Sequence, residues 1–349
     1  MKQKSMSAKQ KAHNKILKYL KNKEIFSIYK DFKKLLKVDN NSYAVAVSGG
    51  PDSLALAYFC KCFSLQNKTK FFYFTVDHRL RKDSGLEAKK VSSNLKKFGI
   101  NCKILIWKGK KPMSNIQSIA RYNRYHLIAK ECKKNKTKNL LLGHQIEDLY
   151  ENFFLRLLRG SGLKGLISMD VTSEDSINGI RIFRPLINIE KLKLINVSKK
   201  VFNFFIKDPS NTNDVFTRIR IRKLINELKR EGLDINKLKL SIKNLKDSDR
   251  TIKFYVSRNI EENAIYFENK QNFFLKRNFF YQPNEIVFRS LSYVLNKISK
   301  RYYSPRGKSL VELINKVKFK DFKKSTLGGC IVEKINESVL ISREKPKKH

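Results

Sequence analysis

The sequence predicts an α/β fold, a parallel sheet with helices on both faces, followed by a smaller accessory C-terminal domain. Two observations support this. Between residues 41 and 225, short apolar runs alternate with segments of helical length, which favours a parallel sheet. The chain has 349 residues, enough for two or three domains at roughly 150 residues each. We therefore distinguish a basic N-terminal segment (1–40), an α/β region (41–225) and an accessory region (226–349).

Four apolar runs predict buried strands: YAVAVS (43–48), FFYFTVDH (71–78), KILIW (103–107) and NLLLGH (139–144). Helical segments are expected at 54–60, 85–98, 116–134 and 147–159. In such sheets, ligands bind in a crevice at the carboxyl ends of the strands. Three strand ends are rich in polar groups, namely SGGPDS, VDH and GHQIED. We therefore expect these segments to lie at one edge of the sheet.

The two ends of the chain are predicted from weaker patterns. Apolar residues at near-helical spacing predict one or two amphipathic helices in residues 1–40; they are Ile16, Leu17, Leu20, Ile25 and Phe26. A basic helix there would either contact RNA or pack on the next domain with its charged face in solvent. The accessory region predicts helices near 235–262 and 284–298, then a hairpin that turns at Gly328-Gly329.

The charge indicates a polyanionic partner. Lys and Arg number 75 against 31 Asp and Glu, a formal net charge of +44. Nucleic acid fits best, because each neutralised phosphate releases counterions. The alternative is a compositional bias toward lysine without a binding role. No run approaches the ~18 apolar residues of a membrane span. The five cysteines lack a CxxC pair or a disulfide framework, so we expect a reduced, cytoplasmic compartment.

The SGGPDS loop (48–53) predicts a site for phosphate. It follows a buried strand and opens a helix. Its two glycines permit a tight turn and a close approach to an anion, and Pro51 suits the first helical turn. Asp52 would repel bare phosphate, so a Mg²⁺ ion between them is expected. The alternative is an ordinary strand-to-helix turn.

Further segments follow this loop in order. They are VDHRLRKDSGLEAKKV (76–91), NIQSIARYNRY (115–125), GHQIEDLYENFFLRLLRGSGLKGL (143–166), RPL (184–186), DPSN (208–211), RIRIRK (218–223) and TLGGC (326–330). Together they resemble the tRNA(Ile)-lysidine synthases, a family of PP-loop (N-type) ATP pyrophosphatases with a Rossmann-like sheet. The resemblance is close over about residues 43–225 and looser elsewhere. Several motifs in order are far more specific than any one of them.

The resemblance implies a two-step ligation. The O2 of the wobble cytidine in the CAU anticodon of tRNA(Ile) attacks the α-phosphate of ATP, which releases pyrophosphate. The amine of free L-lysine then attacks carbon 2 and displaces AMP, which forms lysidine. The second step requires a neutral amine, although a free ε-amine has a pKa of about 10.4. A residue that removes the proton or anchors the lysine is therefore needed.

The resemblance also implies roles for individual residues. The catalytic group is Asp52, His144, Asp148 and Glu151, with His144 or Glu151 as base or lysine anchor. Mg²⁺ would be held by Asp52 and Asp148. ATP would be bound by Ser48, Gly49, Gly50, Pro51, Asp52, Ser53 and Arg121. RNA or phosphate would be bound by Arg159, Arg218, Arg220 and Arg222. Each of these has the alternative of an ordinary structural or surface residue.

Two geometric expectations accompany these roles. If the third-motif helix began by His144, then His144, Asp148 and Glu151 would share one face. If RIRIRK were extended, its alternating arginines would share one side and form a phosphate track.

The chain departs from the family pattern at two places, and three alternative functions remain. The family often has two consecutive His and an Asp-Asp pair where this chain has His144-Gln145 and Glu147-Asp148. The alternatives are a tRNA thiolase, an amidating synthase and a non-catalytic RNA-binding protein. Thiolases of this group usually carry CxxC pairs or a persulfide cysteine, whereas Cys60 and Cys62 fall in a predicted helix. An amidating synthase would need a glutaminase domain, and intact SGGPDS, Asp148 and Glu151 argue against a decayed enzyme.

Overall fold

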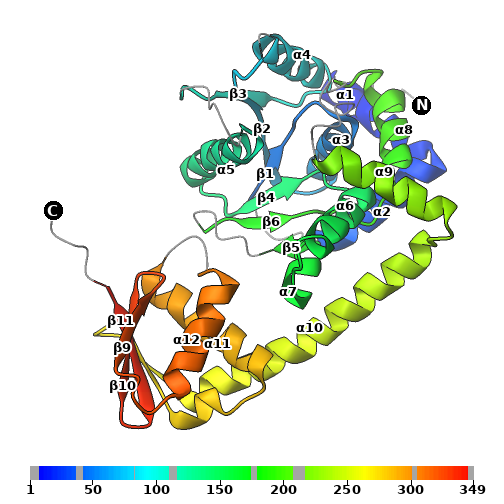
Figure 1. Ribbon diagram of the computed structural model, residues 1–349. Helices are drawn as coiled ribbons and strands as arrows, with labels where there is room; N and C mark the ends of the chain where they lie inside the picture. The colour runs from blue at the N-terminus through cyan, green and yellow to red at the C-terminus, as the bar shows by residue number, and fades with distance from the viewer. Residues whose placement is uncertain are drawn as a thin grey trace, which may run out of the picture. The chain divides into compact units, whose positions relative to one another are not determined.

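The computed structural model describes residues 8–36, 42–81, 83–109, 116–173, 179–206, 217–300 and 305–344 (Figure 1). The DPSN segment (208–211) lies outside the described residues. The chain forms two compact units, Met1–Leu233 and Asp234–His349. The boundary falls beyond the expected one at 225, because helix α9 (Thr217–Arg230) packs against α6 (Ile146–Leu157) of the first unit. No described helix is both long and apolar enough to cross a membrane.

The first unit is built on a six-stranded sheet in the order β3-β2-β1-β4-β6-β5. The strands are β1 (Ser42–Ala46), β2 (Lys70–Asp77), β3 (Cys102–Ile106), β4 (Asn139–Leu142), β5 (Thr172–Ser173) and β6 (Arg181–Phe183). All pairs are parallel except β5, which runs antiparallel to β6. The four predicted strands are confirmed. The other two were not predicted, since segments of two and three residues carry no readable period.

Helices cover both faces of this sheet, which confirms the predicted fold class. In β1, Tyr43 and Val45 point into one core and Ala44 into the other, as alternate strand residues must. The first core receives α1 (Ala8–Leu17), α2 (Lys23–Leu35), α3 (Pro51–Gln66), α4 (Ser84–Lys96) and α8 (Lys191–Phe202). The second receives α5 (Ile116–Lys134). The 3-10 helix η1 (Lys18–Lys21) and the short α7 (Leu163–Leu166) complete the unit.

The basic N-terminal segment forms helices that pack on the sheet unit. Tyr29 and Phe32 of α2 are fully buried, and both rings contact Phe59 of α3, with centroids 6.0 and 5.8 Å away. Lys30 and Lys34 on the other side of α2 are exposed. The amphipathic pattern therefore buries an apolar stripe and leaves its lysines in solvent.

The second unit contains a five-stranded antiparallel sheet in the order β7-β8-β11-β10-β9. Its elements are α10 (Ile235–Asn263), β7 (Ala264–Phe267), β8 (Asn272–Leu275), η3 (Arg277–Phe280), α11 (Asn284–Ser299), α12 (Gly307–Lys318), β9 (Lys324–Leu327), β10 (Cys330–Ile335) and β11 (Ser338–Arg343). The predicted hairpin is confirmed, with positive φ at both Gly328 and Gly329 in the β9–β10 turn. This conformation suits glycine and matches the twist of a tight hairpin.

Candidate active site

The loop after β1 lies where the strand order reverses. β1 is flanked by β2 on one side and β4 on the other, which is the switch point where α/β sheets bind ligands. Gly49 has a φ of +87°, and a Cβ there would lie 2.5 Å from Val91 Cγ2 and 2.9 Å from Ile206 Cγ1. Ile206 N also donates to Gly49 O at 2.9 Å. Only glycine fits this position, so the loop is fixed in its turn.

The same loop starts α3 with a rigid first turn. Gly50 is the N-cap and Pro51 occupies the first turn. Ser53 is buried, and its Oγ accepts from Ser48 N at 3.2 Å and donates to Gly50 O at 2.9 Å. The first-turn N–H groups of Asp52 and Ser53 have no partner within the helix. The positive end of α3 is therefore available to an anion.

Asp52 carries a buried oxygen and an unusual charge balance. Among the described residues, its Oδ1 has no hydrogen-bond partner. Burial first, and then the neighbouring Asp148 carboxylate, raise the pKa of Asp52 to about 7, against the opposing influence of Lys191. Asp148 accepts the Gln145 N–H at 3.0 Å through Oδ2. Two carboxylates that repel each other, one with an unsatisfied oxygen, match the preference of Mg²⁺ for a few carboxylate ligands plus phosphate.

Glu151 is buried in the same acidic cluster and pairs with α9. Arg222 Nε donates to Glu151 Oε1 at 2.5 Å, and Glu151 is 2% exposed. Burial raises the pKa of Glu151, and the Arg222 guanidinium opposes that rise. The ion pair with Arg222 favours the charged form of this carboxylate. Arg222 thus supplies a positive charge to the acidic cluster.

The expectation of an extended RIRIRK segment is wrong, because this sequence lies in helix α9. Ile221 and Ile225, one turn apart, are buried by the helix. Arg218 and Arg222 are also one turn apart and share a face, whereas Arg220 lies on another side, exposed, with Nη2 donating to Thr217 Oγ1 at 3.4 Å. The three arginines therefore do not form a single track.

His144 lies among positive charges and is held neutral. Arg184 Nε donates to His144 Nδ1 at 3.2 Å, and Arg184 Nη1 donates to Asp170 O at 3.1 Å. Burial first, then Arg184, lower the pKa of His144 well below its usual value. Since Nδ1 accepts a hydrogen bond, the ring proton is on Nε2. This arrangement suits a hydrogen-bond donor and not a base.

Helix α5 brings two further cations to this end of the sheet. The guanidinium carbons of Arg121 and Arg124 lie 5.1 and 5.7 Å from the ring centroid of Tyr125. Neither arginine pairs with a carboxylate in the described part of the chain. Burial lowers the pKa of Arg124, and burial and Arg124 lower the pKa of His78 to about 4. Cations assembled without counter-ions favour an anionic ligand.

The predicted residues thus fall into groups. Electrostatic interactions link Asp52, Asp148, Glu151 and Arg222 in one cluster, and link His144 with Arg121 in another. Arg218 acts on both Glu151 and His144. Arg159 is exposed in the turn after α6 and joins neither. Because α6 begins at Ile146, His144 precedes the helix and does not share its face with Asp148 and Glu151.

The two departures from the family pattern have local structural roles. Gln145 is buried as the N-cap of α6, and its Oε1 accepts from Glu147 N at 2.7 Å. The carboxylate of Glu147 accepts the Lys191 N–H at the start of α8, at 3.2 and 3.3 Å. Both side chains therefore cap helices next to the acidic cluster.

Three residues near the site were not predicted. Arg184 and His78 lie in the RPL and VDH segments, and membership of these segments was the only sequence evidence that pointed to them. Lys191 affects the pKa of Asp52, but no sequence pattern identified it.

The cysteines lie in the protein interior. All five are buried, and none forms a disulfide. Burial raises the pKa of Cys62 to about 12, and that of Cys60 well above its usual value. Because the thiolate is the reactive form, these two side chains are inert core residues.

Comparison with known proteins agrees with this geometry. A PP-loop domain model matches residues 18–228. The tRNA(Ile)-lysidine synthase of Wolbachia pipientis wMel is 36% identical over 87% of this chain and 71% of its own length. That of Orientia tsutsugamushi is 33% identical over 88% and 70%. Among solved structures, the U34-tRNA thiolase NcsA of Methanococcus maripaludis matches with a TM-score of 0.54 at 18% identity, over 65% of this chain and 79% of that one, which shows a shared fold. The chain therefore belongs to the tRNA(Ile)-lysidine synthase family and carries a PP-loop domain.

Proposed function

We propose that this protein ligates lysine to carbon 2 of the wobble cytidine in the CAU anticodon of tRNA(Ile), using ATP. The observation that carries the proposal is one shared site. The turn fixed by Gly49, the start of α3 and the acidic cluster of Asp52, Asp148 and Glu151 all lie at the switch point of the sheet. Family membership supports the same reaction.

In the first step, the loop binds the triphosphate of ATP. The N–H groups at the start of α3 hold the pyrophosphate portion, and Arg121 and Arg124 stabilise negative charge that develops as the cytidine O2 attacks the α-phosphate. The bond from the α-phosphate to the bridging oxygen breaks, and pyrophosphate leaves. Asp52 and Asp148 would hold Mg²⁺, which supplies charge neutralisation on the phosphates. Asp52 must be ionised for this role, although its pKa without the metal is about 7.

In the second step, the acidic cluster binds the amino acid. Lysine brings an ammonium group, which Glu151 and Asp148 attract and position. Glu151 is the better acceptor for the amine proton, because burial raises the pKa of Glu151 whereas the pKa of His144 is well below its usual value. His144 Nε2–H remains a donor to the base or to the leaving AMP. The amine attacks carbon 2, the C2–O2 bond breaks, and AMP leaves.

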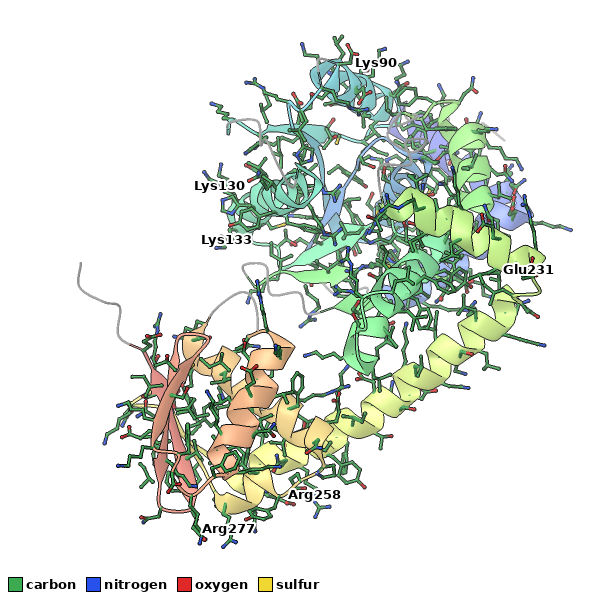
Figure 2. The ribbon with its side chains drawn as sticks, viewed as in Figure 1. Lys90, Lys130, Lys133, Glu231, Arg258 and Arg277 are labelled. Carbon is green, nitrogen blue, oxygen red and sulfur yellow. The ribbon has the colours of Figure 1, made fainter. Side chains whose placement is uncertain are left out.

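The RNA is bound through positive charge. Arg218 and Arg222 of α9 both act on the charge of Glu151 and so lie near the site. Lys130 and Lys133 project from α5 to solvent (Figure 2). Arg159 and Arg220 are exposed and would contact phosphates away from the reacting base. Five buried cysteines without a disulfide support action in the reducing cytoplasm.

The direct test uses ATP, Mg²⁺, labelled lysine and unmodified tRNA(Ile) with a CAU anticodon. We expect label in the RNA and release of pyrophosphate and AMP. Asp52→Ala should abolish pyrophosphate release while RNA retention on a filter persists. A thiolase would incorporate no lysine, and a non-catalytic RNA-binding protein would release no pyrophosphate. Either result with the unsubstituted protein would refute the proposal.

A further inference from the structure

The C-terminal unit contains a cavity of about 620 Å³ that the reaction does not use. Its lining comes from η3 and the residues after it, the end of α12 and the β10–β11 turn. The residues that matter are Arg277, Tyr281, Lys318, Lys320, Lys334 and Glu337. Figure 2 labels Arg277, which projects from this unit. The volume lies in the range of about 300–1,000 Å³ that is usual for ligand pockets.

The cavity has an unbalanced positive charge. The one carboxylate among its described lining residues, that of Glu337, already accepts from Arg277 Nη1 at 2.8 Å through both oxygens. Lys334 is fixed, because its Nζ donates to Phe319 O at 2.6 Å. Lys318 and Lys320 are exposed, and neither forms an ion pair within the described ranges. An anionic group would therefore be attracted to their side of the cavity.

The cavity also carries an exposed aromatic ring in a fixed position. Tyr281 is 70% exposed, and its hydroxyl accepts from Arg277 Nη2 at 3.3 Å. The Arg277 guanidinium carbon lies 5.1 Å from the Tyr281 ring centroid. Because Arg277 is itself held by Glu337, the ring is oriented before any ligand arrives. An oriented, exposed ring beside lysines is the arrangement by which proteins bind unpaired bases.

We propose that this cavity binds one unpaired nucleotide of the RNA substrate, with its base stacked on Tyr281 and its phosphates beside Lys318 and Lys320. This rests on the proposed function only in taking RNA as the substrate. A free nucleotide has the same chemistry. RNA is favoured because the ring is largely open to solvent, which lets a chain enter and leave, whereas free-nucleotide sites bury most of the ligand.

The test measures the affinity of the full chain for unmodified tRNA(Ile), without ATP or lysine. Tyr281→Leu removes the ring, and Tyr281→Phe keeps it. We expect Tyr281→Leu to weaken binding about 5- to 140-fold, which is the ~1–3 kcal/mol of a stacked base at 1.4 kcal/mol per tenfold. Tyr281→Phe loses only the hydrogen bond from Arg277 and keeps the ring, so it should weaken binding much less than Tyr281→Leu. Tyr293→Leu, which removes another exposed tyrosine of this unit outside the cavity, is the matched control and should bind normally.

The phosphate interactions are tested by salt dependence. Lys318→Gln with Lys320→Gln should reduce the slope of log affinity against log salt by about 0.7 for each phosphate that is no longer neutralised. Lys308→Gln with Lys316→Gln removes the same charge from exposed positions of α12 outside the cavity, and should leave the slope unchanged.

Three results would overturn the proposal: unchanged RNA affinity in Tyr281→Leu, equal weakening in Tyr281→Phe, or a raised KM for ATP with unchanged RNA affinity. The last would identify a free nucleotide as the occupant. Because binding is measured without the reaction, a protein that binds RNA but incorporates no lysine would refute the proposed function and leave this test intact.

Discussion

The buried carboxylate of Asp52 should lower the free energy of unfolding of the unliganded protein, and Asp52→Asn should restore it. The carboxyl has an ordinary pKa of 3.8 in the unfolded chain and about 7 in the fold. Between these values the folded state binds a proton that the unfolded state does not, so stability falls as pH rises through this window. At about 1.4 kcal/mol per pKa unit, the loss reaches roughly 4 kcal/mol by pH 8.

The chain offers a selective probe for this measurement. Its one tryptophan, Trp107, lies in the first unit, so urea unfolding followed by tryptophan fluorescence reports that unit alone. We expect the free energies of unfolding of the original protein and Asp52→Asn to differ least near pH 4. By pH 8, Asp52→Asn should be more stable than the original protein by up to roughly 4 kcal/mol. Glu190→Gln, at an exposed carboxyl, should show no such divergence.

The same pair of proteins tests the role of the carboxylate. Added Mg²⁺ and ATP should raise the stability of the original protein, because a ligand that binds only the folded state stabilises it, and should raise that of Asp52→Asn by less, because the variant lacks the carboxylate for the metal. A stability difference that stayed constant from pH 4 to 8, or that shrank as pH rose, would refute the burial argument.

Three further outcomes are expected. Gly49→Ala should destabilise the fold by about 1–3 kcal/mol, because φ is +87° and the new Cβ meets Val91, and should raise the KM for ATP in pyrophosphate exchange. Gly50→Ala, whose Cβ would meet only Ser48 Oγ at 3.7 Å, is the control for stability in urea unfolding. Arg222→Gln should lower the free energy of unfolding by about 2–4 kcal/mol, because it leaves Glu151 buried without its partner. Adding Glu151→Gln should restore part of that loss. If the effects of the two substitutions were simply additive in the double-mutant cycle, the two residues would not be paired. Arg184→Gln should raise the pKa of its histidine partner toward its usual value, read by NMR titration of the imidazole; an unchanged titration would count against the hydrogen bond.

Four strands of the first unit, β1 to β4, were predictable because each is an apolar run that ends in a polar turn. The loop at Ser48–Ser53 was equally legible, since Gly49 and Pro51 mark a turn and a helix start. Helix α9 was misread because its alternating Arg and Ile imitate the period of a strand. The helical spacing of Ile221 and Ile225 identifies it only once the burial of both is known.

Partners across the site were beyond the reach of local patterns. Arg222 meets Glu151 across 71 positions of sequence, and Arg184 meets His144 across 40. Spacing within one helix links Asp148 to Glu151, but only the packing of α9 on α6 determines which arginine neutralises them. Likewise, α6 begins after Gln145 because the Gln145 side chain caps the helix. In the sequence alone, this glutamine is only a departure from the family pattern.

Helix α9 has a consequence for the charge at the site. This one helix places Arg222 beside the acidic cluster and, one turn earlier, Arg218 near His144. A change in the position of this helix would therefore alter the charge around Glu151 and around His144 together. One helix therefore sets the charge around both the group that captures the amino acid and the group beside the nucleotide.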